Sequence, residues 1–168
     1  KALGVLDGLY RAGLSTLPVR ERLARAAAKT AAWAKATEIL ELLMQERESR
    51  DGRIEAARLC MVIHRDHLRE PNAALAAVMK LLSEAPGDGE ALDLVLSGAF
   101  PKSHELSLLL AGQGALVESL VREPLDAERL DRLARVAARL DNAPLRQAAL
   151  GSLVALGAGT PAADRELG

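Results

Sequence analysis

The chain has 168 residues, with 22 basic and 23 acidic side chains, so its formal net charge at pH 7 is −1. This length suits one domain of ordinary size, and the balanced charge gives no general attraction to nucleic acid or to an anionic membrane surface. The single cysteine excludes an internal disulfide framework, and the presence of one Trp, one Tyr and one Phe argues against an aromatic base-stacking platform.

Helical periodicity is the dominant pattern along the chain, and turn residues break it at short intervals. Alanine and leucine, which favour helices, make up more than a third of the residues, whereas β-branched residues are sparse. We therefore predict an all-α fold of about ten helices joined by short turns. In chain order, these helices are expected at about residues 2–12, 18–30, 33–44, 51–68, 71–85, 90–99, 103–112, 116–123, 126–140 and 144–157.

Proline and aspartate mark several of the predicted helix starts. Pro18 and Pro71 suit the first turn of a helix, because proline lacks the N–H group that the first turn leaves without a helical partner. Asp51 and Asp126 are predicted N-caps, since a carboxylate accepts hydrogen bonds from the free N–H groups at a helix start.

Two glycines are expected to interrupt the helical pattern in the second half of the chain. Gly112 and Gly114 follow an apolar run that begins near Ser103, and Leu116 starts another run that ends before Pro124. Glycine in a helix interior costs about 1 kcal/mol relative to alanine. We therefore predict two short helices in this region.

The order of large and small apolar residues repeats loosely between two neighbouring helix pairs. The offset is 36 residues in the first helix of the pair and 38 residues in the second. Small residues let two helices cross closely, and large residues fill the groove against the next pair. The corresponding residues are Leu23, Ala24, Ala27, Ala36, Leu40 and Leu43 in the first copy and Leu59, Cys60, Ile63, Ala74, Val78 and Leu81 in the second.

Together with Pro86, the second copy resembles the signature of the tetratricopeptide repeat family from Arg53 to Asp88, if a two-residue insertion is placed near His67. This stretch is similar to the long-turn variant of large bacterial helical-repeat proteins. The first copy is a weaker match, as is the segment 126–157.

The resemblance implies a right-handed α-α superhelix, that is, a solenoid of antiparallel helix hairpins, over residues 1–157. The segment 158–168 is rich in Gly, Pro and Ala and is predicted to be a flexible tail. Residues 89–124 fit the pattern poorly, and the usual aromatic residues of the motif are absent. A generic α-hairpin solenoid and a closed helical bundle remain the alternatives. The family likeness further implies a non-catalytic scaffold that binds other proteins.

The sequence contains no apolar run of the roughly 18 residues that a membrane span needs, and no signal-peptide pattern at its start. We therefore expect no membrane partner and a cytoplasmic location. Because the first residue is a lysine and both end helices are apolar, we expect the chain to be a fragment of a longer array.

Cys60, His64 and His67 form the sharpest cluster of chemically active side chains. Their spacing places them near one face of a helix, where they could supply three zinc ligands. Cys60 also occupies a position where the repeat requires a small residue, and histidines near a helix end are favoured by the helix dipole. We therefore predict a structural role with no metal or cofactor, and keep a zinc-binding helical protein as the weaker alternative.

The sequence contains no known catalytic motif and no phosphate-binding loop. Gly112-Gln-Gly114 is not a dinucleotide-binding motif, because it lacks the third glycine. Glu38 and Glu41 alternate with basic residues on a helix face that the pattern predicts to be solvated. Acid–base catalysis instead needs carboxylates held in a shared pocket. We therefore expect a protein that is not an enzyme.

The resemblance implies that the first helix of each pair lines a concave surface, and arginine is frequent at these positions. The second helices carry more acid, at Glu38, Glu41 and Glu84. Guanidinium groups bind carboxylates bidentately, so the expected partner is a protein or peptide segment, an acidic one if the arginines take part. The predicted peptide-binding residues are Arg22, Arg25, Lys29, Arg58, Met61, His64, Arg65, Arg132, Arg135 and Arg139.

A structural spacer within a larger helical-repeat protein is the alternative function. In that case the same residues are ordinary solvated helix positions.

Overall fold

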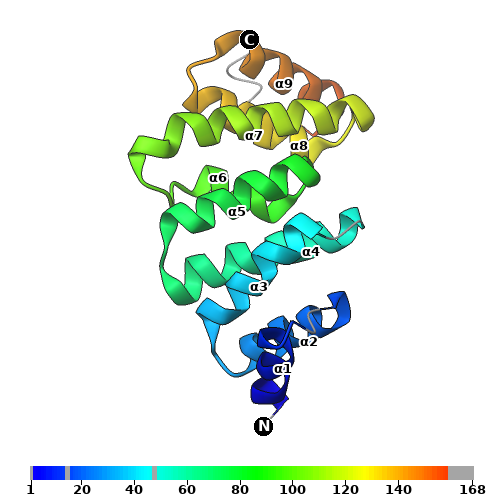
Figure 1. Ribbon diagram of the computed structural model, residues 1–168. Helices are drawn as coiled ribbons and strands as arrows, with labels where there is room; N and C mark the ends of the chain where they lie inside the picture. The colour runs from blue at the N-terminus through cyan, green and yellow to red at the C-terminus, as the bar shows by residue number, and fades with distance from the viewer. Residues whose placement is uncertain (1, 14–15, 47–48, 159–168) are drawn as a thin grey trace. The chain divides into compact units, whose positions relative to one another are not determined.

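The computed structural model describes residues 2–13, 16–46 and 49–158, and within them the chain is all-helical, as predicted (Figure 1). These residues form nine α-helices and one π-helical segment, with no strand among them. The chain divides into two compact units, Lys1–Glu84 (unit 1) and Ala85–Gly168 (unit 2). The predicted flexible tail lies, apart from Ala158, outside the described residues.

Unit 1 is built from a first helix and two helix hairpins (Figure 1). Each α-helix contacts the next one along the chain, because each carries apolar residues on the face that its neighbour covers. The predicted proline starts are confirmed: Pro18 lies in the first turn of the second helix and Pro71 begins the last one. The elements are α1 (Ala2–Arg11), α2 (Leu17–Lys29), α3 (Trp33–Glu46), α4 (Arg50–Val62), the π-helical segment η1 (Ile63–Leu68) and α5 (Pro71–Glu84).

The apolar positions of the two repeat copies form the core of unit 1. Leu59 is half-buried, and the other eleven positions are buried. The small residues Ala24 and Cys60 lie at equivalent places in α2 and α4 and let the paired helix approach.

The predicted insertion near His67 coincides with η1. The N–H of Glu70 donates to the carbonyl oxygen of His64 at 2.9 Å, a bond that reaches back six residues, and Arg69 adopts the left-handed conformation with φ of 55°. A π-helical turn is wider than an α-helical turn, so it holds an extra residue without opening the hairpin.

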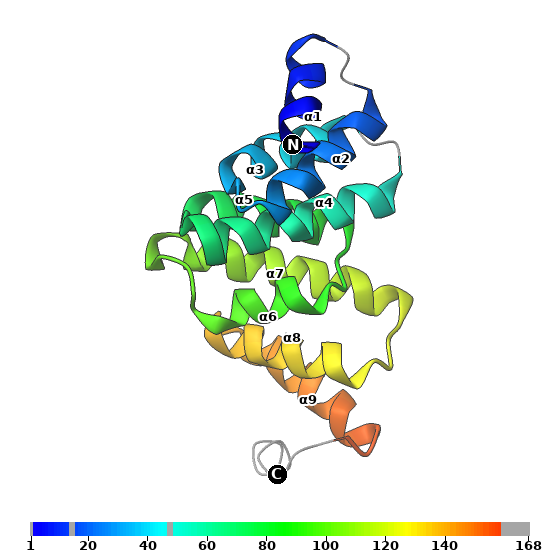
Figure 2. The same cartoon turned by 90° about the horizontal axis from the view of Figure 1, so that it is seen from below.

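Unit 2 contains, in its described part, α6 (Gly89–Ser97), α7 (Lys102–Arg122), α8 (Ala127–Arg139) and α9 (Ala143–Ala155). Helix α6 contacts both α7 and α8, and α8 forms a hairpin with α9 (Figure 2). Asp88, Asp126 and Asn142 cap α6, α8 and α9 by accepting a hydrogen bond from the backbone N–H three residues ahead. The predicted N-cap at Asp126 is therefore confirmed.

The predicted break at Gly112 and Gly114 is wrong, because α7 is one continuous helix of 21 residues. Gly112 is buried where α6 crosses α7, and a Cβ placed on it would lie 3.0 Å from Cγ1 of Val95. The glycine is required by this close approach and does not end the helix. The two short helices predicted here are thus one, which accounts for nine helices in the described residues where about ten were predicted.

A left-handed residue closes the hairpin corner in each unit. Ala31 has a φ of 57°, and the N–H of Ala32 donates to the carbonyl oxygen of Ala27 at 2.9 Å, as in a Schellman motif. Between α8 and α9, Asp141 has a φ of 54°, and the N–H of Asn142 makes the same 2.9 Å bond to the carbonyl oxygen five residues earlier.

Replacing Ala31 by glycine is expected to raise the free energy of unfolding by about 0.5–1 kcal/mol, because glycine adopts a positive φ without the steric cost of a Cβ. Trp33, the single tryptophan of the chain, reports unfolding of unit 1 in a urea titration. As the control, Ala28→Gly within α2 is expected to lower the same free energy by about 1 kcal/mol. If both glycines destabilise equally, the corner does not have the left-handed conformation.

Candidate functional site

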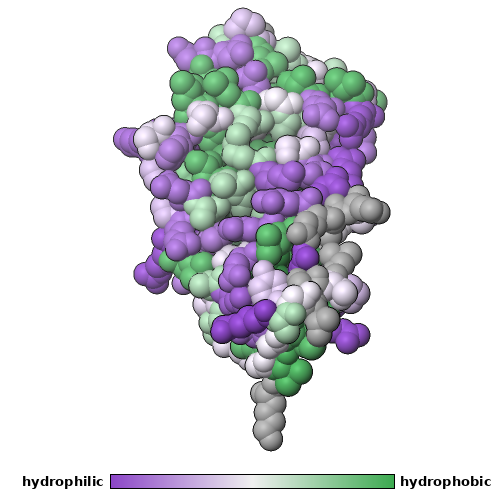
Figure 3. All heavy atoms as spheres, in the orientation of Figure 1, coloured by the Kyte–Doolittle hydropathy of each residue, from purple (hydrophilic) through white to green (hydrophobic). Residues whose placement is uncertain are grey.

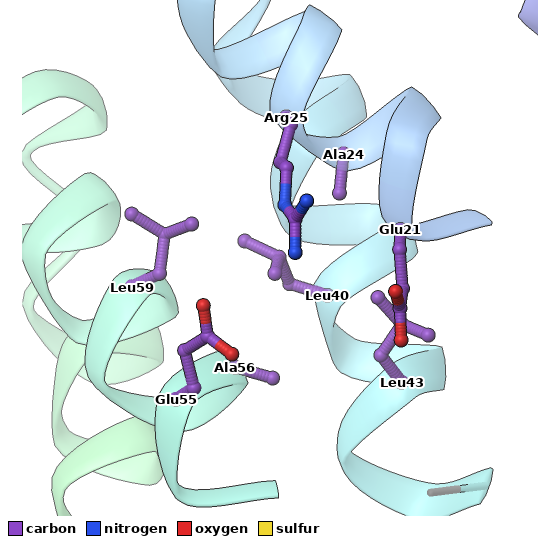
Figure 4. Close-up of a pocket in the computed structure, with 8 residues that line it drawn as sticks. All are labelled: Glu21, Ala24, Arg25, Leu40, Leu43, Glu55, Ala56 and Leu59. Carbon is purple, nitrogen blue, oxygen red and sulfur yellow. The ribbon is translucent and has the colours of Figure 1, made fainter. Parts of the chain in front are cut away.

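A shallow groove in unit 1 is formed by the helices α2, α3 and α4 (Figure 4). Its floor is apolar, its rim carries three charged side chains, and its cavity volume is about 30 Å³. We call this surface the α2–α4 groove. It is lined by Glu21, Ala24 and Arg25 from α2, Leu40 and Leu43 from α3, and Glu55, Ala56 and Leu59 from α4.

The charged side chains lie around this apolar floor (Figure 4). The guanidinium of Arg25 extends from α2 toward Leu40, and the carboxylate of Glu55 rises from α4 toward the same groove. Glu21 lies nearer to the end of the groove at Leu43. The groove therefore offers a contact for an apolar side chain beside both a cation and carboxylates.

The predicted binding residues of unit 1 divide into exposed and buried ones. Arg22, Arg25 and Lys29 are exposed and lie on one face of α2, and Arg58 is exposed on α4. The exposed Arg65 donates to the neighbouring Asp66 at 2.6 Å, and this hydrogen bond holds the pKa of Asp66 below its usual value.

Met61 and His64 do not take the exposed position that was predicted for them. Met61 is 1% exposed and belongs to the core, and His64 is 5% exposed. Both side chains are buried because α4, which carries Met61, and η1, which carries His64, each pack against α3 and α5.

The predicted arginines of unit 2 are used mainly to hold its helices together. Arg132 has a side chain only 11% exposed and pairs with Asp93 of α6 at 2.8 Å, which lowers the pKa of that carboxyl through the hydrogen bond. Arg139 donates to the carbonyl oxygen of Leu96 at 2.9 Å and also pairs with a carboxylate of α7. Arg135 is more exposed, with Asp131 at 3.8 Å.

A larger cavity lies among α3, α4, η1 and α5, and we call it the α3–α5 cavity. Its volume is about 240 Å³. Its walls combine small apolar residues with a few polar groups. It is lined by Glu41, Met44 and Gln45 from α3, Cys60 from α4, His64 from η1, and Ala73, Ala76, Ala77 and Lys80 from α5.

The three candidate zinc ligands are not brought together. Cys60 and His64 line the α3–α5 cavity, whereas the ring of His67 stacks on Trp33 with centroids 3.8 Å apart and planes 4° from parallel. Burial, and then the charge of Glu41, raise the pKa of the Cys60 thiol to about 12. Within the described ranges, no group of three His, Cys, Asp or Glu side chains is arranged to hold a metal ion.

Unit 2 carries a row of exposed apolar residues on α7 (Figure 3). They recur at helical spacing on the side of α7 that faces away from its buried residues. Figure 3 shows apolar surface gathered near both ends of this helix. The row consists of Leu106, Leu110, Val117 and Val121.

Sequence reasoning missed the acidic side chains of both sites. Glu21 and Glu55 were not singled out, and Glu41 was assigned only to a solvated face, although it lines the α3–α5 cavity. The run of alanines in α5 is the sequence feature that could have indicated the cavity, because residues without long side chains leave space beside Cys60 and His64.

None of the helices in the described ranges is long and apolar enough to span a lipid bilayer. No protein-family model, curated protein or solved structure gives a significant match to this chain.

Proposed function

We propose that the protein is a non-catalytic, tetratricopeptide-like helical-repeat module that binds a peptide or protein segment, with its hairpins stacked as a right-handed superhelix. Two features support the repeat: the burial of equivalent positions in both copies, and the Schellman corner that the α2–α3 hairpin has in common with the α8–α9 hairpin. The segment binds across the α2–α4 groove.

The geometry of that groove is the observation that carries the proposal. A volume of about 30 Å³ is close to that of one water molecule. This groove is too small to enclose a small-molecule ligand, but it suits the tip of one apolar side chain from a peptide that lies across α2 and α4. Arg25, above the same floor, would bind a carboxylate next to that side chain.

Charge favours an acidic segment on this part of unit 1. Arg22 and Lys29 on α2 and Arg58 on α4 are exposed and, with Arg25, outnumber the rim carboxylates Glu21 and Glu55. An excess of positive charge on these two helices steers an acidic partner toward the groove and fixes its register. The arginines of unit 2 contribute less, because Arg132 and Arg139 already pair with carboxylates of their own unit.

A structural spacer is the second candidate function, and the apolar row on α7 favours it. Four exposed apolar side chains at helical spacing on one side of α7 are suited to packing against another helix. In this alternative, peptides have no affinity for the α2–α4 groove.

Fluorescence anisotropy with a labelled peptide tests the proposal. The probe is a ten-residue acidic peptide with one central leucine, and its lysine-substituted counterpart is the comparison. We expect the acidic peptide to bind, and Arg25→Glu to weaken this binding at least tenfold, which is about 1.4 kcal/mol. The loss should shrink as salt is raised, since exposed charges are screened.

Lys102→Glu is the matched control, because it makes the same charge change at an exposed residue of unit 2 and should alter the dissociation constant less than twofold. Equal binding of the acidic and basic peptides, or equal binding to the wild type and Arg25→Glu, contradicts the proposal. Binding that is lost instead in Leu110→Glu places the peptide on α7 and also contradicts the groove, whereas the absence of binding by either peptide supports the structural alternative.

A further inference from the structure

The α3–α5 cavity shares no residue with the α2–α4 groove and has a different chemistry. Its volume of about 240 Å³ corresponds to roughly eight water molecules, which is enough for a small organic molecule. Met44 and the alanines of α5 supply apolar walls, and Glu41 and His64 supply polar atoms.

His64 is held in a fixed orientation at the edge of this cavity. Its side chain is 6% exposed, and its Nδ1 lies 2.9 Å from Oε2 of Glu70. Its backbone carbonyl accepts the N–H of the same residue, Glu70, at 2.9 Å. Two bonds to one neighbour therefore fix both the backbone and the ring.

This arrangement leaves an acceptor pair facing the cavity. In the neutral tautomer that donates from Nδ1 to the carboxylate of Glu70, Nε2 carries a lone pair. That nitrogen lies 3.5 Å from Oε1 of Glu41, which is also an acceptor. In this tautomer no hydrogen lies between the two acceptors, so a donor from outside would satisfy both.

The charges around the cavity favour a positively charged donor. Lys80, the cation in the cavity wall, already pairs with Glu84 at 3.0 Å. The Glu41 carboxylate is half exposed, and within the described ranges its ion-pair contact is the long one to His64. Its charge also acts across the cavity, since it contributes to the raised pKa of the Cys60 thiol.

We propose that the α3–α5 cavity binds a small organic cation, a primary amine or amidine on an apolar body. The charged N–H groups donate to Glu41 and to Nε2 of His64, and the apolar body packs against Met44 and the alanines Ala73, Ala76 and Ala77. The charge-assisted hydrogen bond discriminates against neutral molecules, and the apolar walls discriminate against larger ones.

The experiment is a calorimetric titration of the full chain with 2-phenylethylamine, which has about nine non-hydrogen atoms and fills a cavity of this size. For so small a ligand we expect saturable one-site binding with a dissociation constant on the order of 1 mM. The neutral isostere 2-phenylethanol should bind at least tenfold more weakly. The fluorescence of Trp33 gives a second signal. Its ring stacks on His67, which lies in the same π-helical segment as His64.

Two variants and one matched control locate the site. Glu41→Gln should weaken amine binding at least tenfold, whereas Glu38→Gln, one turn away on α3 and paired with Lys35, should leave it within twofold. Ala76→Leu should abolish binding by filling the cavity; Ala76 is exposed at its rim, so the helical circular dichroism should not change.

Equal affinity for the amine and the alcohol overturns the proposal, as does unchanged binding in Glu41→Gln. A capped lysine, Nα-acetyl-lysine amide, tests whether the natural ligand is a free amine or the lysine side chain of a protein partner. Weaker binding of the capped lysine supports a free amine, and tighter binding of it overturns that assignment. Because peptide binding by the α2–α4 groove uses Arg25, failure of one proposal leaves the other intact.

Discussion

Replacing Gly112 by leucine is expected to lower the free energy of unfolding of unit 2 by about 3 kcal/mol. The first added carbon would lie 3.0 Å from Cγ1 of Val95, and the rest of the side chain has to displace α6 from α7. Chemical denaturation followed by circular dichroism measures this loss. The effect should exceed the gain of about 1 kcal/mol in helix propensity that removal of a glycine brings.

Gly114 supplies the control in the same helix. It is exposed, and nothing lies within 4 Å of a Cβ placed on it, so Gly114→Ala should raise the free energy of unfolding by about 1 kcal/mol. Combining Gly112→Leu with Val95→Ala should recover at least about 1 kcal/mol, since the two side chains compete for one space. If both glycine substitutions stabilise the protein, α6 does not cross α7 at Gly112.

Replacing Glu84 by glutamine is expected to destabilise unit 1 by about 2 kcal/mol at neutral pH, because charge-assisted hydrogen bonds are the stronger ones. Glu84 accepts hydrogen bonds from Arg53 at 2.9 and 3.0 Å and pairs with Lys80 at 3.0 Å. Its backbone oxygen accepts a further bond from Arg50 at 2.7 Å, which fastens the end of α5 to the start of α4.

The same residue makes the stability of unit 1 depend on acid. The hydrogen bond from Arg53, followed by that from Lys80, lowers the pKa of Glu84 from 4.5 to about 2. Between these values the unfolded chain binds a proton that the folded chain does not, so stability falls as the pH falls. The wild type should therefore lose stability from about pH 5 to pH 2, and Glu84→Gln should lose less over this window.

Urea titrations at several pH values, followed by Trp33 fluorescence, measure this dependence. Glu38→Gln is the control, because the pair between Glu38 and Lys35 is solvent-exposed and contributes about 0.5 kcal/mol or less. Parallel pH profiles for the wild type and Glu84→Gln would show that Glu84 is not the group responsible.

Local sequence signals predicted the helical class, most of the helix limits and the buried faces. Proline positions such as Pro71 and the N-cap at Asp126 were predictable because they act within one turn of the residue itself. The predicted N-cap at Asp51 is wrong. Ser49 caps α4 by accepting a hydrogen bond from the N–H of Gly52, and Asp51 lies inside the first turn.

The partners of side chains from distant elements were not predictable in this way. Arg132 has the spacing of an exposed helix residue, but it meets Asp93, which lies 39 residues earlier in the chain. Gly112 has the sequence signature of a break, yet it lies inside a helix because Val95 of another helix approaches it. In both cases the deciding atom belongs to a residue that no local pattern connects with the first.

The candidate site was predicted in part. The spacing of Cys60 and His64 placed both on one face, and both line the α3–α5 cavity. The third residue, His67, falls in the wider turn of η1, where the angular step between residues differs from that of an α-helix, and it stacks on Trp33 instead. The residues that complete the cavity come from α3 and α5.

The tight corners also have a consequence for how the chain folds. The hairpins α2–α3 and α8–α9 join residues that are near in sequence, since Ala31 and Asp141 each turn the chain within three residues. Contacts of short sequence separation form fast, because little loop entropy is lost. Each hairpin is thus expected to nucleate its own unit. Long-range ion pairs such as Arg132 with Asp93 should form only after that nucleus exists.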